Sequence, residues 1–364
     1  MAGAAIVSGA LANKPWNGGN AWTRLSFILG LRRLGFEVVF IEQLSDASQE
    51  ARDYFGLVCA SYGVDGYLLS DAVVQEEVST RVENAALLIN IGGHLTVEAL
   101  KRAARVRVFL DDDPGYTQIW HASGQLGTRL AGHNHYYTVG SCVGTPASQI
   151  PAGDVEWRAL RPPVVLSEWP VSTGGNSFTT IGSWRGAYGP VEYAGKRFGQ
   201  KAHEFRRFIE LPKLTSQSFE IALDIHEADS ADRVRLHENG WRLVDPRVAA
   251  GTPEAFRAYV QESSAEFSVA QGVHAHLNSG WFSDRTTRYL ASGKPALVQE
   301  TGFGRSLPVG EGLLSFRALG EATDGVARIV GEYEAHCEAA RRLAETYLDS
   351  DLVLGRLLDE VGIG

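Results

Sequence analysis

AAIVSG at Ala4–Gly9 is a short apolar run that ends in glycine, a pattern typical of a buried parallel strand. Apolar residues then recur at helical spacing up to Gly35, and a glycine commonly follows the last turn of a helix. A second apolar run, VVFI at Val38–Ile41, predicts the next strand. The opening therefore predicts a strand–helix–strand unit whose first loop, NKPWNGGN at Asn13–Asn20, contains paired glycines.

The same alternation continues along the chain and predicts its fold class. Further strands are predicted at 86–90, 106–110, 178–181, 219–223, 241–244 and 296–299. Strands that alternate with helices imply mostly parallel sheets covered on both faces. A chain of 364 residues is also too long for one ordinary core, and the small polar stretch Ser172–Ser177 suits a boundary. We therefore predict an α/β protein of two Rossmann-like, doubly wound domains, 1–172 and 173–345, that face each other across a cleft.

The composition narrows the classes of partner and location. Lys and Arg total 34 against 43 Asp and Glu, a net charge of −9, which argues against duplex nucleic acid as a partner because its binders carry a basic face. The three cysteines are far apart, so neither a disulfide framework nor a zinc site is expected. No apolar run approaches the roughly 20 residues that span a bilayer. These features predict a cytoplasmic protein without a transmembrane segment.

Two short segments at predicted strand ends carry candidate ligand contacts. The backbone amides of Gly18 and Gly19 can approach a ligand closely at the start of a helix, although a plain tight turn explains them equally well. The spacing is not the GxGxxG fingerprint of dinucleotide-binding proteins, which argues against NAD or FAD. Arg185 follows a strand and Lys201 begins a helix, so the two can hold a diphosphate unless both are merely solvated.

The longest candidate segment is SGWFSDRTTRYLASGKPALVQETGFG at 279–304. Ser283 or Asp284 can cap a helix that ends at Gly293, and a buried strand and a second glycine-rich loop follow. Capping does not account for the aromatic and basic side chains nearby, which we expect to be exposed: Trp281, Phe282, Arg285 and Arg288.

Taken in order, these segments resemble the GT-B glycosyltransferases, in particular those whose C-terminal donor domain is of the family-1 or family-4 type. The resemblance implies that residues 1–172 bind the acceptor, that residues 173–345 bind a nucleotide-diphosphate sugar, and that a C-terminal helix in 346–364 crosses back to the first domain. It implies this sugar nucleotide as co-substrate, with no tightly bound cofactor and no metal. The implied donor contacts are Gly18, Gly19, Arg185, Lys201, Asp284, Arg285, Glu300, Thr301 and Gly302.

One departure from that family pattern affects the sugar contacts. Many retaining members carry two glutamates eight residues apart, and those positions are Gly280 and Arg288 in this sequence. Glu300 or Asp284 is the candidate to replace one of the missing hydroxyl contacts.

The acceptor side has two candidate catalytic residues, His94 and Asp113, each after a predicted strand. A histidine can act as a base or hydrogen-bond the transferred sugar, and a carboxylate can deprotonate an acceptor hydroxyl. A packed histidine and a surface acidic run, or a divalent metal at Asp111–Asp113, are the other interpretations. With Arg185 and Lys201 these residues form the predicted catalytic set.

The leading hypothesis is transfer of a sugar to a small-molecule or glycan acceptor. The alternatives are a sugar-nucleotide epimerase and a non-catalytic nucleotide-sugar-binding protein on the same fold. An epimerase would need two acid–base groups at one sugar carbon, and a binding protein would show binding without turnover.

Overall fold

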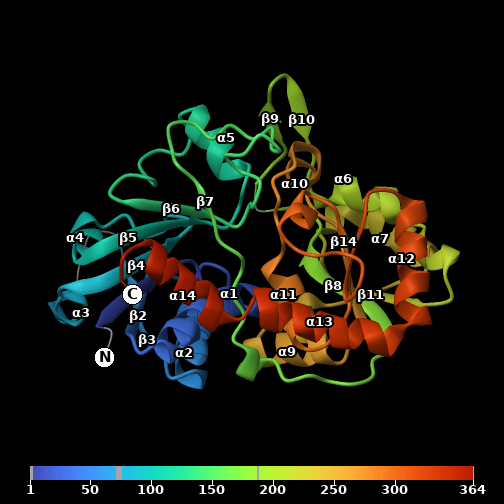
Figure 1. Ribbon diagram of the computed structural model, residues 1–364, viewed down its shortest axis with the longest axis horizontal. Helices are drawn as coiled ribbons and strands as arrows, with labels where there is room; N and C mark the ends of the chain where they lie inside the picture. Colours follow the sequence, from blue (N-terminus) through green and yellow to red (C-terminus); the bar gives the residue numbers. More distant parts are fainter. Residues whose placement is uncertain (1–2, 71–75, 187, 364) are drawn as a thin grey trace.

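The computed structural model describes residues 3–70, 76–186 and 188–363, and these form two halves, each built on a parallel sheet (Figure 1). The first sheet has seven strands in the order β3-β2-β1-β4-β5-β6-β7. Its strands are β1 (Ala4–Ser8), β2 (Glu37–Gln43), β3 (Asp65–Leu69), β4 (Ala85–Ile91), β5 (Ala104–Asp111), β6 (His135–Thr138) and β7 (Arg158–Ala159). Its helices are α1 (Gly18–Arg33), α2 (Gln49–Ser61), α3 (Glu76–Val82), α4 (Glu98–Arg102) and α5 (Tyr116–Ala122).

The second sheet has six parallel strands in the order β12-β11-β8-β13-β14-β15. These are β8 (Ser177–Ser183), β11 (Ser218–Asp224), β12 (Trp241–Val244), β13 (Ala265–Ser268), β14 (Ala296–Gln299) and β15 (Leu313–Phe316). A hairpin, β9 (Val191–Tyr193) and β10 (Lys196–Phe198), lies outside this sheet. The helices are α6 (Lys201–Phe205), α7 (Ser230–Glu238), α8 (Pro246–Ala250), α9 (Pro253–Gln261), α10 (Gly272–Leu277), α11 (Asp284–Ala291), α12 (Leu319–Gly331), α13 (Tyr333–Tyr347) and α14 (Ser350–Glu360). Five 3₁₀ turns are η1 (Leu166–Glu168), η2 (Arg206–Phe208), η3 (Leu211–Leu214), η4 (Glu227–Asp229) and η5 (Phe303–Arg305).

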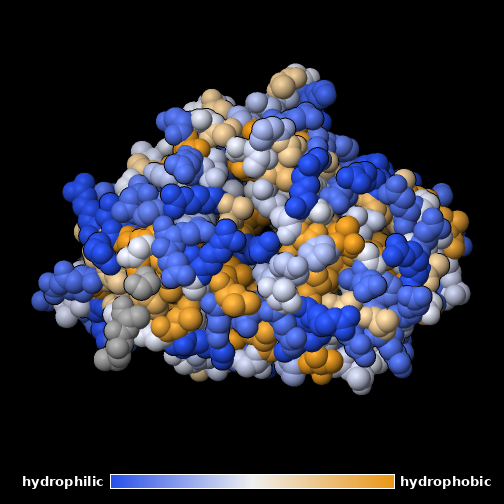
Figure 2. Space-filling model, in the orientation of Figure 1, coloured by the Kyte–Doolittle hydropathy of each residue, from blue (hydrophilic) through white to orange (hydrophobic). Residues whose placement is uncertain are grey.

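This architecture confirms the predicted fold class of two doubly wound α/β units. Strand order reverses beside β1 in the first sheet and beside β8 in the second, so the loops that follow these strands diverge and leave a crevice. The surface is hollowed between the two halves (Figure 2). Within the described ranges, no helix combines the length and the apolar character that crossing a bilayer requires.

The last helix, α14, lies against α1 of the first half (Figure 1). Arg33 on α1 pairs with Asp351 on α14 at 2.7 Å, and the side chain of Leu354 lies directly over Gly30. The backbone N–H of Val164 donates to the carbonyl of Leu348 at 2.8 Å just before α14 begins. The chain therefore returns from the second half to the helix layer of the first.

The two halves touch closely at the first turn of α1. A Cβ on Gly18 would lie 2.2 Å from the carbonyl oxygen of Thr252, so only glycine fits there without a backbone shift. The indole N–H of Trp22 donates to the carbonyl of Pro253 at 2.7 Å, and Tyr54 donates to the carbonyl of Gly251 at 3.1 Å. One continuous apolar core runs through this contact, so α1 is fixed relative to α9.

Candidate active site

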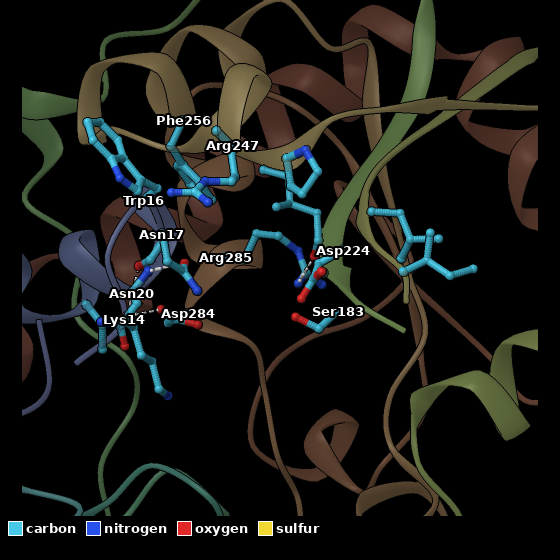
Figure 3. A pocket seen from close by; sticks show the side chains of 18 of the residues that line it. Lys14, Trp16, Asn17, Asn20, Ser183, Asp224, Arg247, Phe256, Asp284 and Arg285 are labelled. Atoms are coloured by element: carbon cyan, nitrogen blue, oxygen red, sulfur yellow. Dashed lines mark hydrogen bonds between the residues drawn. The ribbon is translucent and has the colours of Figure 1, made fainter. Parts of the chain in front are cut away.

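A cleft of about 1630 Å³ lies between the two halves at the carboxyl ends of both sheets. Its walls come from the loop after β1, α1 and the end of β5 on one side, and from the ends of β8, β11 and β12 with the starts of α10 and α11 on the other. Figure 3 shows Arg285 extending toward Ser183 and Asp224, away from Lys14 and Asn17 on the opposite wall. Four of the predicted site residues line the cleft: Gly19, Asp113, Asp284 and Arg285.

Arg285 forms the buried floor of the cleft in the second half. Its Nε donates to Oε1 of Glu266 at 2.6 Å, and its two Nη atoms donate to the carbonyl of Ile181 at 2.9 Å and to Ser268 at 2.7 Å. Glu266 is completely buried, so its charge is compensated locally by this arginine. The guanidinium is thereby fixed in position beside the end of β8.

Lys201 lies beside this pair at the start of α6. Its Nζ is 2.9 Å from the point where a Cβ on Gly182, a lining residue, would lie, so the absence of a side chain there makes room for the ammonium. In the described part of the chain, the side chain of Lys201 forms no hydrogen bond or ion pair. Burial and the positive charge of Arg285 lower the pKa of Lys201 to about 7. The site therefore holds a lysine, partly protonated at neutral pH, that is paired with no carboxylate in the described part of the chain.

Arg185, the other predicted diphosphate contact, points elsewhere. Its guanidinium is exposed and donates two hydrogen bonds to the carboxylate of Asp229, at 2.7 and 2.8 Å. Neither Arg185 nor Lys201 is among the residues that line the cleft; Lys201 lies behind Gly182, a lining residue, whereas Arg185 points to Asp229.

The predicted loop contacts Glu300, Thr301 and Gly302 also lie outside the cleft lining. Oε1 of Glu300 accepts a hydrogen bond from the N–H of Gly302 at 2.6 Å. The hydroxyl of Thr301 donates to the carbonyl of Trp281, and the Thr301 carbonyl accepts from Gly280 at 2.7 Å. The polar groups of this loop are thus used to hold the loop before α11.

The expectation that the side chains around Ser283 are exposed is wrong. Phe282 and Arg288 are only 3% and 1% exposed, Arg285 is buried, and Trp281 is half-buried with its ring stacked on His274 at 4.7 Å. The reason is that α11 begins at the contact between the halves. Arg288 donates to the carbonyl of Gly19 at 3.3 Å.

Asp284 belongs to the same contact. Its carboxylate accepts a hydrogen bond from Thr23 on α1 and pairs with Arg288 at 3.0 Å. Burial raises the pKa of Asp284, but the charge of Arg288 and the Thr23 hydrogen bond outweigh it and hold the pKa below its ordinary value. Asp284 is therefore an ionised group on the cleft wall.

The three aspartates after β5 have separate environments. Asp111 is fully buried and accepts hydrogen bonds from Thr117, Gln118 and Thr138 at 2.6 to 2.7 Å, which gives it a structural role. The interpretation of this run as surface charge is therefore wrong for Asp111. Asp113 lines the cleft, where burial and the neighbouring charge of Asp112 raise its pKa to about 7. Across 3–70, 76–186 and 188–363, no group of three or more metal-ligating side chains is placed to hold a metal ion.

His94 lies beside Asp112 but outside the cleft lining. Burial and the charge of Arg24 lower the pKa of His94 to about 4, so its imidazole is neutral at physiological pH. Its half-buried position next to the strand ends matches neither a fully packed nor a solvent-exposed histidine.

Lys14, Arg24 and His274 also line the cleft and are among the lining residues that the sequence did not predict. Lys14 lies in the same loop as Gly18 and Gly19, so its position in a loop after a strand was a usable signal. His274 lies in the helix that follows the strand Ala265–Ser268, so its position after a strand was a usable signal. Burial lowers the pKa of His274 to about 3. Arg24 lies within α1, where nothing in the periodicity distinguishes it.

No protein-family model matches the chain, and no curated protein matches it by sequence. Solved structures match along its whole length. An α-glucosyltransferase in complex with UDP-glucose and DNA containing an abasic site has a TM-score of 0.65 at 10% identity, over 99% of both chains. HepE from Anabaena, in complex with UDP and glucose, has a TM-score of 0.60 at 9% identity, over 98% of this chain and 99% of its own. A sucrose-phosphate synthase from Thermosynechococcus elongatus has a TM-score of 0.52 at 11% identity, over 99% of both chains. The chain has the GT-B fold.

The comparison corrects one prediction about partners. A further GT-B structure with a TM-score of 0.58 and 10% identity is an α-glucosyltransferase in complex with UDP and a 13-mer DNA containing a central A:G mismatch. The prediction that excluded duplex nucleic acid is wrong, because GT-B proteins of this shape occur in complexes with DNA. A net charge averages over the whole surface and says nothing about one local binding face.

Proposed function

We propose that this protein is a nucleotide-sugar-dependent glycosyltransferase that binds the donor on its second half and the acceptor on its first. The observation that carries the proposal is Lys201, an unpaired, half-buried lysine whose Nζ lies beside Gly182 near the end of β8, the switch-point strand of the second sheet. Buried charges in proteins are normally paired, so an unpaired one beside a cleft favours an anionic ligand. In open α/β sheets this is also the place where ligands bind.

The ligand chemistry follows from the local charges. Lys201 and Arg285 are the two basic groups here, and Glu266 is paired with Arg285. The charge of Asp284 also acts on Arg285 but is paired with Arg288, so Lys201 has no carboxylate of its own among the described residues. A nucleotide diphosphate supplies the missing negative charge and gains more as the sugar departs. Fixed cations that meet developing charge stabilise the transition state more than the ground state. Arg185 can contact the same ligand only if its hydrogen bonds to Asp229 break. Gly19 and Asp284 are the other predicted donor contacts that line the cleft.

The acceptor chemistry is proposed to involve Asp113. A carboxylate whose pKa is about 7 is ionised for a large fraction of molecules at neutral pH and is still basic enough to accept a proton from a hydroxyl. It lies on the wall opposite the donor cations, where an acceptor hydroxyl and the sugar carbon would meet. His94, which is neutral, would serve as a hydrogen-bonding group near the acceptor.

The size of the cleft favours a two-substrate reaction. At about 1630 Å³ it exceeds the roughly 300–1,000 Å³ usual for single-ligand pockets. Donor and acceptor therefore fit together, whereas an epimerase needs space for the sugar nucleotide alone.

The three cysteines are all free, and we propose the cytoplasm as the compartment.

The test is a screen of nucleotide diphosphates by thermal shift, followed by an assay of their release from the matching sugar nucleotides. UDP and UDP-glucose come first, because solved proteins of this fold bind them. A ligand at 100 times its Kd should add about 2.7 kcal/mol to the free energy of unfolding. Slow release of nucleotide diphosphate supports the proposal. If no nucleotide diphosphate shifts the Tm, the proposal is refuted. Inversion of configuration at one carbon of the donor sugar, without net release of nucleotide diphosphate, would indicate an epimerase.

A further inference from the structure

Lys14 stands on the first-half wall of the cleft at the end of a tightly held loop. The buried carboxylate of Glu42 accepts hydrogen bonds from the backbone N–H groups of Leu11, at 2.8 Å, and Asn13, at 2.9 Å. The side-chain amide of Asn20 donates to the carbonyl of Ala10 at 2.6 Å. These contacts fix the backbone immediately before Lys14, so the lysine projects from a rigid base (Figure 3).

The ammonium of Lys14 has no hydrogen bond or ion pair within the residues that the structure describes. Figure 3 shows its side chain extended away from Asn17 and Asn20. A fixed loop that presents one uncompensated cation to a cleft is suited to an anion, since a lysine acts there as a point charge.

Arg24 provides the second observation. Its side chain is only 4% exposed, lines the cleft and touches one carboxylate, Asp112, at 3.5 Å. Its Nε is buried without any hydrogen-bond partner and lies against Gly9, where a Cβ would be 3.0 Å away. Buried guanidinium donors are normally all satisfied, so Arg24 is an incompletely paired cation on the cleft wall.

The charges around these two residues leave room for an anion. The nearby carboxylates are Asp112, Asp113, Glu42 and Asp284. Glu42 accepts hydrogen bonds from backbone N–H groups, Asp284 is paired with Arg288, and burial keeps Asp113 partly protonated at neutral pH. Arg129, on the same edge, is exposed and forms no ion pair in the described chain. Among the described residues, Asp112 is thus the one carboxylate in ion-pair contact with any of the three cations Lys14, Arg24 and Arg129.

We propose that Lys14 and Arg24 bind an anionic group, a phosphate or a carboxylate, carried by the acceptor substrate. This inference rests on the proposed function and specifies its substrate class as an anionic polyol or sugar. The anionic group lies on the wall of the cleft that also carries Asp113, so one acceptor places its anion on the cations and a hydroxyl near the carboxylate. The donor diphosphate is held separately by Lys201 and Arg285.

The test is calorimetric titration of the UDP-saturated protein with inorganic phosphate, glucose 6-phosphate, glucuronate and glucose. We expect phosphate-bearing or carboxylate-bearing probes to bind and glucose to bind at least about 10-fold more weakly, on the scale of one charge-assisted contact. Lys14→Gln should weaken the anionic probes by about 10-fold and leave the Kd of UDP unchanged. The matched control is Lys213→Gln, an exposed lysine on η3, which should change neither. Preference for glucose 6-phosphate or for glucuronate distinguishes the two anions.

Equal affinity of wild-type and Lys14→Gln proteins for all three anionic probes would overturn the inference. A second titration, without UDP and in Lys201→Gln protein, removes the cation of the proposed donor site. If phosphate binding to the Lys201→Gln protein depends on Lys14 while UDP fails to bind the wild type, the proposed function is refuted but the anion site is supported. UDP binding without any Lys14-dependent probe would refute only the anion site.

Discussion

The guanidinium of Arg285 is paired with the carboxylate of Glu266 through an N–O distance of 2.6 Å, and the neighbouring Lys201 has no ion-pair partner of its own in the described chain. The arrangement is costly in the ligand-free protein, because burial disfavours the charged form of Lys201. It is useful if a diphosphate supplies the missing charge. Stability and function therefore oppose each other at this position.

Replacement of Lys201 should show that opposition. We expect Lys201→Met to raise the Tm of the free protein, because it removes a buried charge and keeps a similar volume. The same variant should lower transfer by roughly 10²-fold, the scale of one lost electrostatic group. Differential scanning fluorimetry with and without UDP, and a UDP-release assay, measure both effects. Unchanged turnover in the folded variant would place the donor elsewhere.

The pH dependence of UDP binding should report on the same residue. The pKa of Lys201 is about 7 in the free protein, and a bound diphosphate raises it. Below about pH 7 the lysine is protonated in both states, so it adds no pH dependence. Above about pH 7 binding takes up a proton, so UDP affinity should fall as the pH rises. Titration calorimetry in buffers of different ionisation enthalpy measures this uptake, which should be absent in Lys201→Met.

Arg185 should matter less than Lys201. Its two hydrogen bonds to Asp229 must break before it can reach a ligand, and its exposed position weakens any contact that it makes. We expect Arg185→Ala to reduce transfer by at most about 10-fold, less than the loss of one preorganised donor in a closed site. Steady-state UDP release compares the two variants directly. A loss equal to that of Lys201→Met would show that Arg185 swings into the site.

Gly18 should tolerate no side chain, because a Cβ there would lie 2.2 Å from the carbonyl oxygen of Thr252 and 2.7 Å from that of Ala250. Relief requires movement of backbone in the other half, so we expect Gly18→Ala to cost about 1–3 kcal/mol or more of unfolding free energy. Urea denaturation measures the change. Gly56→Ala is the matched control, since Gly56 is an exposed helical glycine with no atom nearby, and it should be neutral or stabilising by up to about 1 kcal/mol. A Gly18→Ala protein as stable as the wild type would show that the contact is loose.

The contrast between Gly18 and the strands shows which features sequence patterns could predict. Runs such as Val38–Ile41 report burial in a sheet through local composition, so the α/β alternation and the strand ends were predictable. The role of Gly18 was not, because Thr252 is distant in sequence and meets it only after both halves have folded and docked. The glycine was predicted to approach a ligand, and in the structure it approaches backbone of the second half.

The same limit applies to charges in the site. A helix that starts near Ser283 was predictable from capping, but the burial of Arg288 depends on the docking of α1 against it. Lys201 was predictable as a basic residue at a helix start. Its lack of an ion-pair partner was not predictable. It depends on the ion pair between Arg285 on α11 and Glu266 on β13, a contact that forms only when the helix packs on the strand.

The proposed role of Asp113 as a general base predicts the direction of the pH dependence of transfer: activity is lost as the pH falls. Burial and the charge of Asp112 raise the pKa of Asp113 to about 7, so the basic carboxylate form disappears as the pH falls below about 7. At saturating donor, where the bound diphosphate keeps Lys201 protonated, we expect kcat/KM for the acceptor to fall about 10-fold per pH unit on the acid side and to level off above pH 7. Asp113→Asn should lower transfer by roughly 10²-fold or more and abolish this acid limb. Asp359→Asn, at an exposed carboxylate on α14, is the control and should keep both rate and profile. An acid limb that persists in folded Asp113→Asn protein would assign the base to another group. The placement of Asp113 across the cleft from Arg285 makes its loss a defect in turnover, with UDP binding left intact.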